Sequence, residues 1–96
     1  MKGYVVCVWE KINSEEKLKK YAIKAKIAAD KYSGIFIIRG GNFENVLGKW
    51  EYARTVVIKF PSYETALNWY NSDEYKPVRK IREENSEGNV IIIEGK

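Results

Sequence analysis

The sequence contains no histidine among its 96 residues. This absence excludes a Ser-His or Cys-His nucleophile pair, a zinc ion held by imidazole and a haem with a proximal histidine. A single cysteine, Cys7, excludes an intramolecular disulfide and any cysteine-based metal motif. Because Cys7 lies inside the apolar segment 4–9, we interpret it as a small buried strand residue. Proton transfer would therefore fall to carboxylates, tyrosines, lysines or this one thiol.

Long hydrophobic runs are also missing, and no segment approaches the ~20 apolar residues of a membrane span. The N-terminus enters a strand pattern without a small-residue cleavage site, so we expect a cytoplasmic protein. The net charge is +4, but many lysines fall between the apolar positions of one predicted helix, as on a solvated face. We therefore expect neither a membrane nor a nucleic acid as partner. The composition, 45% hydrophobic and 31% charged, is that of one globular domain over residues 1–96.

The remaining pattern alternates between strands and helices. Apolar runs predict strands at 4–9, 35–38, 54–60 and 90–93. Apolar residues spaced three and four apart predict a helix that begins at Asn13, with Glu16 completing a capping box. That helix should stop at Ser33-Gly34, because glycine suits the left-handed position after a helix.

The second half of the chain contains several turn signals. Ser62 is expected to cap a helix that Asn71-Ser72-Asp73 interrupts, and Pro77 is expected in a first turn or at a kink of the following piece. Segment 43–53 predicts a short twisted hairpin extension, and Glu87-Gly88-Asn89 predicts a turn into the last strand.

The order strand, helix, strand, strand, helix, strand predicts an α+β, ferredoxin-like β-α-β-β-α-β fold. Right-handed crossovers give a four-stranded antiparallel sheet of order 4-1-3-2 with the helices on one face. A sheet with one solvated face should alternate apolar and polar residues, but these strands are apolar on both faces. In the first strand, Val5, Cys7 and Trp9 lie on one face and Tyr4, Val6 and Val8 on the other. We therefore predict a homodimer in which a second copy covers the face without helices.

Several segments carry a resemblance to a known family. They are Gly3-Tyr4, 32–41, 54–62, Ala66, 69–72, Tyr75, Arg82 and Glu94-Gly95. In these segments the chain resembles the domain-of-unknown-function 1330 family of the dimeric α/β-barrel superfamily, although Ser33 stands where glycine is usual and Asp73 where proline is common. The resemblance implies a homodimer with a pocket between the sheet and its helices. It supplies no reaction, since related barrels include cofactor-independent monooxygenases, haem-degrading enzymes, peroxidases and lactone isomerases.

Two arginines are the main candidates for ligand binding. Arg39 ends one predicted strand and Arg54 begins its neighbour, so their guanidinium groups should converge near the turn at Gly40-Gly41. Paired guanidinium groups suit a small anionic ligand, a carboxylate or a phosphate. The alternative is that each arginine pairs with a nearby acid, the candidates being Glu10, Glu44 and Glu51.

A polar and aromatic cluster around the helix break supplies further ligand-binding candidates, namely Tyr70, Asn71, Ser72 and Tyr75. The alternative is that Ser72 caps a helix while the aromatic side chains pack in the core. The catalytic candidates are Tyr70 and Glu94, a carboxylate on the last strand that could transfer a proton if it faces the pocket. Glu94 could instead be exposed, or pair with Arg82 or Lys59.

These residues leave two main functions open. One is a small enzyme, a cofactor-independent oxygenase or isomerase acting on a small anionic or aromatic metabolite. The other is a non-catalytic module that binds a metabolite or partner on the same dimeric scaffold. RNA binding ranks last, because the inner strands lack the basic-aromatic pattern of RNA-recognition domains.

We expect no cofactor, since scattered carboxylates and tyrosines are the remaining ligands for a metal. Elemental analysis of protein purified without an affinity tag should find no stoichiometric transition metal. One iron or zinc ion per chain would overturn this expectation.

Overall fold

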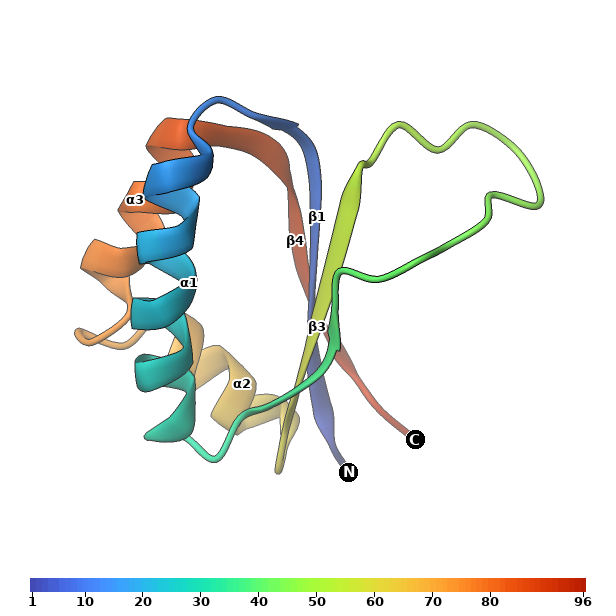
Figure 1. Ribbon diagram of the computed structural model, residues 1–96. Helices are drawn as coiled ribbons and strands as arrows, with labels where there is room; N and C mark the ends of the chain where they lie inside the picture. The colour runs from blue at the N-terminus through green and yellow to red at the C-terminus, as the bar shows by residue number, and fades with distance from the viewer.

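The computed structural model describes residues 1–96. Its elements are β1 (Gly3–Ile12), α1 (Glu15–Asp30), β2 (Ile35–Arg39), β3 (Arg54–Phe60), α2 (Tyr63–Tyr70), α3 (Lys76–Asn85) and β4 (Ser86–Glu94). The strands form one antiparallel sheet in the order β2-β3-β1-β4, and the helices cover one of its faces (Figure 1). The predicted ferredoxin-like arrangement is therefore confirmed, with its second helix divided into α2 and α3. None of the helices is long and apolar enough to span a membrane.

The core lies between the sheet and the helices. Val5, Cys7 and Trp9 of β1 face the helices and are each at most 4% exposed. Behind them, the rings of Trp69 and Tyr75 stack with their centroids 4.0 Å apart. These two buried aromatic side chains join α2 to the start of α3, so the break between the helices is itself part of the core.

The N-terminal cap of α1 differs from the prediction. Ser14, rather than Asn13, caps the helix, and its Oγ accepts the backbone N–H of Lys17 at 3.3 Å. The backbone N–H of Asn13 instead donates to the carbonyl oxygen of Asn85 at 2.8 Å. The capping box with Glu16 is therefore wrong, because Asn13 is held by the end of α3 and the helix begins one residue later.

The end of α1 also differs in detail. Ser33, not Gly34, adopts the left-handed conformation, with φ of 61°. A Cβ on Gly34 would lie 2.7 Å from the ring of Phe60, so this glycine is required for close packing. The predictions for the second helical region are confirmed: Ser62 Oγ accepts the N–H of Thr65, and Pro77 lies in the first turn of α3.

Two segments predicted from turn signals have other structures. Residues 41–53 form no strand, so the hairpin extension is wrong, and the segment is an irregular loop. Gly88 lies inside β4 rather than in a turn before it, because β4 begins at Ser86 directly after α3. A Cβ on Gly88 would collide with the carbonyl oxygen of Val8, and the register between β1 and β4 shifts nearby, between Trp9 and Lys11. The glycine therefore serves a close approach of two strands.

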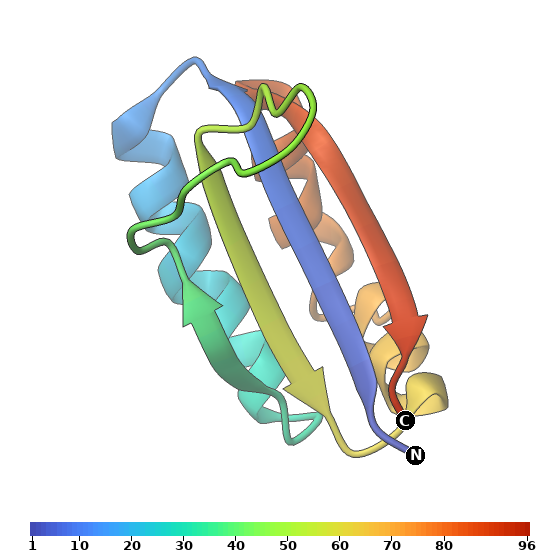
Figure 2. The same ribbon diagram turned by 90° about the vertical axis from the view of Figure 1, so that its right-hand side faces the viewer.

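The second face of the sheet, which we call the open face, carries no helix. It is the face toward the viewer in Figure 2, where loop 41–53 crosses in front of one end of the sheet. Large aliphatic side chains remain 45–57% exposed on β2 and β4, namely Ile35, Ile37, Ile38, Ile91 and Ile93. The hydroxyl of Tyr52, in the loop, is hydrogen-bonded to Asn89 Oδ1 of β4 at 2.9 Å. The loop is thus attached to β4, and the open face is apolar as predicted.

Three buried groups in the core can lose a proton at high pH. The hydroxyl oxygens of Tyr21 and Tyr75 are 2.7 Å apart and hydrogen-bonded. Burial raises the pKa of both tyrosines above their ordinary value of about 10. Burial also raises the pKa of the Cys7 thiol to about 11. The folded chain therefore holds three protons that the unfolded chain releases at lower pH.

We expect the free energy of unfolding to be steady from neutral pH to about pH 8.5 and to fall as the pH rises above about 9. Above that pH the unfolded chain loses these protons while the folded chain keeps them, so alkali favours unfolding. Each group lowers the stability by about 1.4 kcal/mol per pH unit once it has ionised in the unfolded chain. Urea unfolding at a series of pH values measures this slope.

The double variant Tyr21→Phe/Tyr75→Phe removes both hydroxyls together and should flatten most of the alkaline slope. Tyr63→Phe, at a half-buried position that begins α2, is the matched control and should leave the slope unchanged. A wild-type stability that stays level to about pH 10.5 would contradict the prediction.

Candidate functional site

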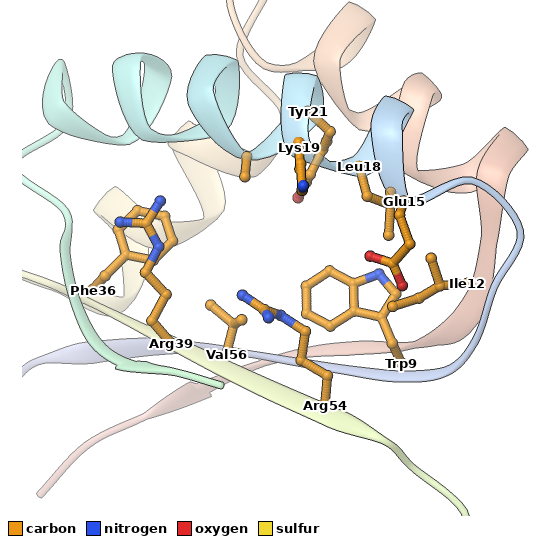
Figure 3. Close-up of a pocket in the computed structure, with 11 residues that line it drawn as sticks. Trp9, Ile12, Glu15, Leu18, Lys19, Tyr21, Phe36, Arg39, Arg54 and Val56 are labelled. Carbon is orange, nitrogen blue, oxygen red and sulfur yellow. The ribbon is translucent and has the colours of Figure 1, made fainter. Parts of the chain in front are cut away.

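A cavity of about 180 Å³ lies between α1 and one end of the sheet, the end at which Trp9, Arg39 and Arg54 lie. Figure 3 shows α1 above the cavity and the strands β1, β2 and β3 below it. The lining residues are Trp9, Ile12, Glu15, Leu18, Lys19, Tyr21, Ala22, Phe36, Arg39, Arg54 and Val56. This is the pocket between sheet and helices that the family resemblance implied.

The register of the strands places both arginines on the helix-covered face. Arg39 is paired with Val56, and Arg54 is paired with Trp9. Because directly opposed residues of antiparallel strands point to the same face, both arginines share the side of Trp9 and Val56. Both line the cavity, and their side chains rise from the strands toward α1 (Figure 3). The structure therefore brings together the two arginines that the sequence singled out.

The glycine turn has a direct role in this arrangement. Gly40 has φ of 74° and Gly41 has φ of 100°, conformations that side chains rarely adopt. A Cβ on Gly40 would lie 3.2 Å from Nη1 of Arg54, so the turn packs closely against that guanidinium group. A Cβ on Gly41 would meet no atom within 4 Å, so this glycine is required only for its backbone conformation.

Neither arginine has an acidic partner. The ion pairs of the structure are Lys20–Glu16, Lys26–Asp30 and Arg79–Glu83, all within single helices. Arg39 instead lies over the ring of Phe36, with its guanidinium carbon 5.0 Å from the ring centroid. Pairing with Glu10, Glu44 or Glu51 is thus not seen. With Lys19 also present and Glu15 the one carboxylate in the lining, the cavity has an excess of positive charge.

Sequence reasoning missed several lining residues. Trp9, which the strand pattern placed on one face of the first strand, is 4% exposed, and its ring forms a wall of the cavity. Its Nε1 is buried without a hydrogen-bond partner. Glu15 and Lys19 come from the first turns of α1, four residues apart and next to Leu18 in the apolar stripe. Residues four apart lie on the same side of a helix, so their spacing next to the apolar stripe was the signal that could have placed both side chains at the cavity.

The predicted cluster around the helix break lies elsewhere. Asn71 Nδ2 donates to the carbonyl oxygen of Leu67, and Ser72 Oγ donates to that of Trp69 while accepting the N–H of Tyr75. These are the capping contacts of the alternative interpretation. Tyr75 is 1% exposed and does not line the cavity. Its hydroxyl is hydrogen-bonded to the hydroxyl of Tyr21, which does line the cavity.

The two catalytic candidates also lie outside the cavity. Glu94 pairs with Gly3, at the end of the sheet opposite to Trp9 and Arg54, so it does not face this cavity. Tyr70 packs against Trp69, Tyr75 and the guanidinium group of Arg79. Their catalytic roles stay predictions without support from the geometry. No three cysteine, aspartate or glutamate side chains lie close enough together to hold a metal ion.

The fold is shared with solved structures of low sequence identity. A dimeric ferredoxin-like protein of unknown function from Jannaschia sp. CCS1 matches with a TM-score of 0.76 and 10% identity, over 100% of this chain and 99% of that one. A protein of unknown function from Rhodopseudomonas palustris matches with a TM-score of 0.75 and 10% identity, over 99% and 82%. An ethyl tert-butyl ether D family protein from Bacillus halodurans C-125 matches with a TM-score of 0.65 and 13% identity, over the full length of both chains.

These likenesses establish the ferredoxin-like fold and no activity. Among curated proteins the chain has no significant sequence match. The model of one protein family, described as Domain of unknown function (DUF1330), matches residues 2–96. The match covers nearly the whole chain, including both strands that carry the cavity arginines, and the chain belongs to the DUF1330 family.

Proposed function

We propose that the protein is a cytoplasmic homodimer that binds a small, singly charged carboxylate with an apolar or aromatic body. The observation that carries this proposal is the pair Arg39 and Arg54, which line one cavity without an acidic partner. Two guanidinium groups can hold a carboxylate through parallel hydrogen bonds. A bound carboxylate would then reduce the excess of positive charge that Arg39, Arg54 and Lys19 carry over Glu15.

The walls of the cavity favour an apolar or aromatic ligand body. Seven of its eleven lining residues are hydrophobic, and Trp9 and Phe36 supply flat surfaces. Indole and phenyl rings bind apolar groups with little loss of conformational freedom. The volume of about 180 Å³ is below the roughly 300–1,000 Å³ of pockets for drug-sized ligands, so the ligand is small.

A second candidate function is cofactor-independent catalysis, of the isomerase or oxygenase type, in the same cavity. Glu15 favours it, since this carboxylate lines the cavity opposite the arginines and could accept a proton from a bound ligand. Glu15 replaces Glu94 and Tyr70 as the residue to test. Turnover by the wild type that Glu15→Gln abolishes, with binding retained, would favour catalysis over binding alone.

The homodimer is proposed from the open face. The chain exposes 6418 Å², whereas a monomer of 11.2 kDa exposes roughly 5,700 Å². Loop 41–53 adds further exposed apolar side chains at Phe43, Val46 and Leu47. An aliphatic surface favours a second apolar sheet over a nucleic acid, which needs basic and aromatic groups. The protein from Jannaschia sp., which has the same fold, is described as dimeric, and this supports a dimer without indicating which face it buries.

Removing either cavity arginine should weaken carboxylate binding without unfolding the protein. Arg39→Ala or Arg54→Ala should each cost about 1.5–3 kcal/mol of binding free energy, the range for hydrogen bonds to charged groups. Both side chains are exposed, so the melting temperature should change little. Calorimetry with benzoate and related monocarboxylates, beside thermal unfolding, measures both effects.

Lys20→Ala is the matched control, because it removes a positive charge from α1 without touching the cavity. Its affinity for the same carboxylates should equal that of the wild type. If the arginine variants lose stability but keep their affinity, the arginines have a structural role and the proposal is wrong.

Placing a charge on the open face should dissociate the dimer. Ile91 is 54% exposed in the single chain, so Ile91→Asp should leave each protomer folded while making burial against a partner costly. Val57→Asp, at the centre of the same face, should act more strongly. Light scattering at micromolar concentration should report a wild-type dimer and monomeric variants.

The control is Ile27→Asp on α1, a residue 56% exposed on the opposite side of the molecule. This variant should remain a dimer. A wild type that is monomeric and stable at the same concentration would overturn the proposed assembly.

A further inference from the structure

Glu15 is the one negatively charged residue in the lining of the cavity. It lies in the first turn of α1, and Figure 3 shows its carboxylate extending from the helix toward Trp9. Arg39 lies at the other end of the same view, with Arg54 between them. The strand order agrees, because β3 with Arg54 separates β2 with Arg39 from β1 with Trp9. The cavity therefore has a guanidinium group at one end and a carboxylate at the other.

The protein leaves the carboxylate of Glu15 without an ion-pair partner. A comparison within the same helix makes this clear. Glu16 and Lys20, four residues apart, form an ion pair at 3.8 Å on the exposed side of α1. Glu15 and Lys19 have the same spacing and both line the cavity, but they form no ion pair. The carboxylate of Glu15 is therefore available to a ligand in the cavity.

An acidic residue in the first turn of a helix is favourable whatever it faces, because it interacts with the helix dipole. Glu16 occupies the same turn as Glu15 and does not line the cavity. The two residues are alike in charge and in position along the helix, and they differ in access to the cavity. Glu16 is therefore the control that separates the helix dipole from contact with a ligand.

The length of the cavity suits one aromatic ring with polar groups at both ends. Arg39 and Trp9 lie two strands apart, which corresponds to about 10 Å across the sheet. The part of α1 that lines the cavity runs from Glu15 to Ala22, which also corresponds to about 10 Å. Between the charged ends the lining is mostly hydrophobic. A ligand without a polar group at the Glu15 end would leave that carboxylate facing an apolar edge, which is unfavourable.

We propose that Glu15 determines the specificity of this cavity by accepting a hydrogen bond from a hydroxyl group of the ligand, which is therefore a hydroxylated aromatic carboxylate. This inference rests on the proposed function, since Arg39 and Arg54 hold the carboxylate of the same ligand. An ionised carboxylate only accepts hydrogen bonds, so Glu15 requires a donor, and a bond to a charged acceptor is stronger than one between neutral groups. The donor is a neutral hydroxyl rather than an ammonium group. The lining holds three positive side chains and one negative one, which favours a ligand with a net negative charge over a zwitterion.

The test compares benzoate with 3-hydroxybenzoate, 4-hydroxybenzoate and 4-methoxybenzoate by calorimetry on the whole chain. The better of the two hydroxybenzoates should bind about tenfold more tightly than benzoate, as expected for a hydrogen bond to a charged group. The methoxy compound has no donor and should show no such gain. In Glu15→Ala the ratio of the two affinities should fall to about one. The ratio is the informative quantity, because removing a negative charge strengthens the binding of every carboxylate. Glu15→Gln keeps an acceptor oxygen and should give an intermediate ratio.

Glu16→Ala is the matched control and should keep the wild-type ratio. Both glutamates are exposed, so these variants should fold. Equal binding of benzoate and both hydroxybenzoates by the wild type overturns this inference while the proposed function stands. A preference that survives in Glu15→Ala, or that Glu16→Ala also removes, overturns the role of Glu15. Tighter binding of the zwitterion 4-(aminomethyl)benzoate than of the hydroxybenzoates overturns the choice of a hydroxyl. If none of these carboxylates binds, the proposed function is wrong and this inference with it.

Discussion

A sheet that is apolar on both faces but covered by helices on only one is the constraint on which the rest of the structure depends. Burial of Val5, Cys7 and Trp9 against the helices builds the core of a single chain. The other face leaves Ile35, Ile91 and neighbouring aliphatic groups in contact with water. The hydrophobic effect acts on both faces alike, so the chain carries an unsatisfied surface wherever the helices do not reach.

The cavity lies on the other face of the sheet, the face that the helices cover. Helix α1 is rich in alanine and approaches the sheet closely along Ala25, Ala28 and Ala29, which are each at most 3% exposed. Toward its N-terminus, longer side chains take over at Leu18 and Tyr21, and the helix leaves a space above Arg54. The position of the cavity thus follows from the change in side-chain size along one helix.

Arginines in this molecule are held mainly by aromatic rings. Arg39 lies over Phe36, Arg79 over Tyr70 and Arg82 over Trp9. Of these, Arg79 alone also has a carboxylate, Glu83, at 4.0 Å. A ring face attracts a cation but does not neutralise its charge. The cavity therefore keeps a positive potential that a bound anion could use.

Local signals in the sequence were enough for the elements and their order. Hydrophobic runs, the cap at Ser62 and the proline at position 77 each act over a few residues, and the strand order followed from crossover handedness. Errors arose where a distant residue competes. Asn13 bonds to Asn85, and Gly34 and Gly88 are shaped by Phe60 and Val8, contacts that no local pattern contains.

The sequence by itself placed Arg39 and Arg54 at the abutting ends of two adjacent strands. Their common face followed from the register of the folded sheet, which shifts between Phe36 and Ile38 just before Arg39. Only the tertiary structure decided that Glu15, Lys19 and Trp9 complete the cavity and that Glu94 and Tyr70 stay outside it. The reason is that strand register is set by backbone hydrogen bonds with a period of two residues, whereas the rotation and height of α1 over the sheet depend on the packing of many side chains at once.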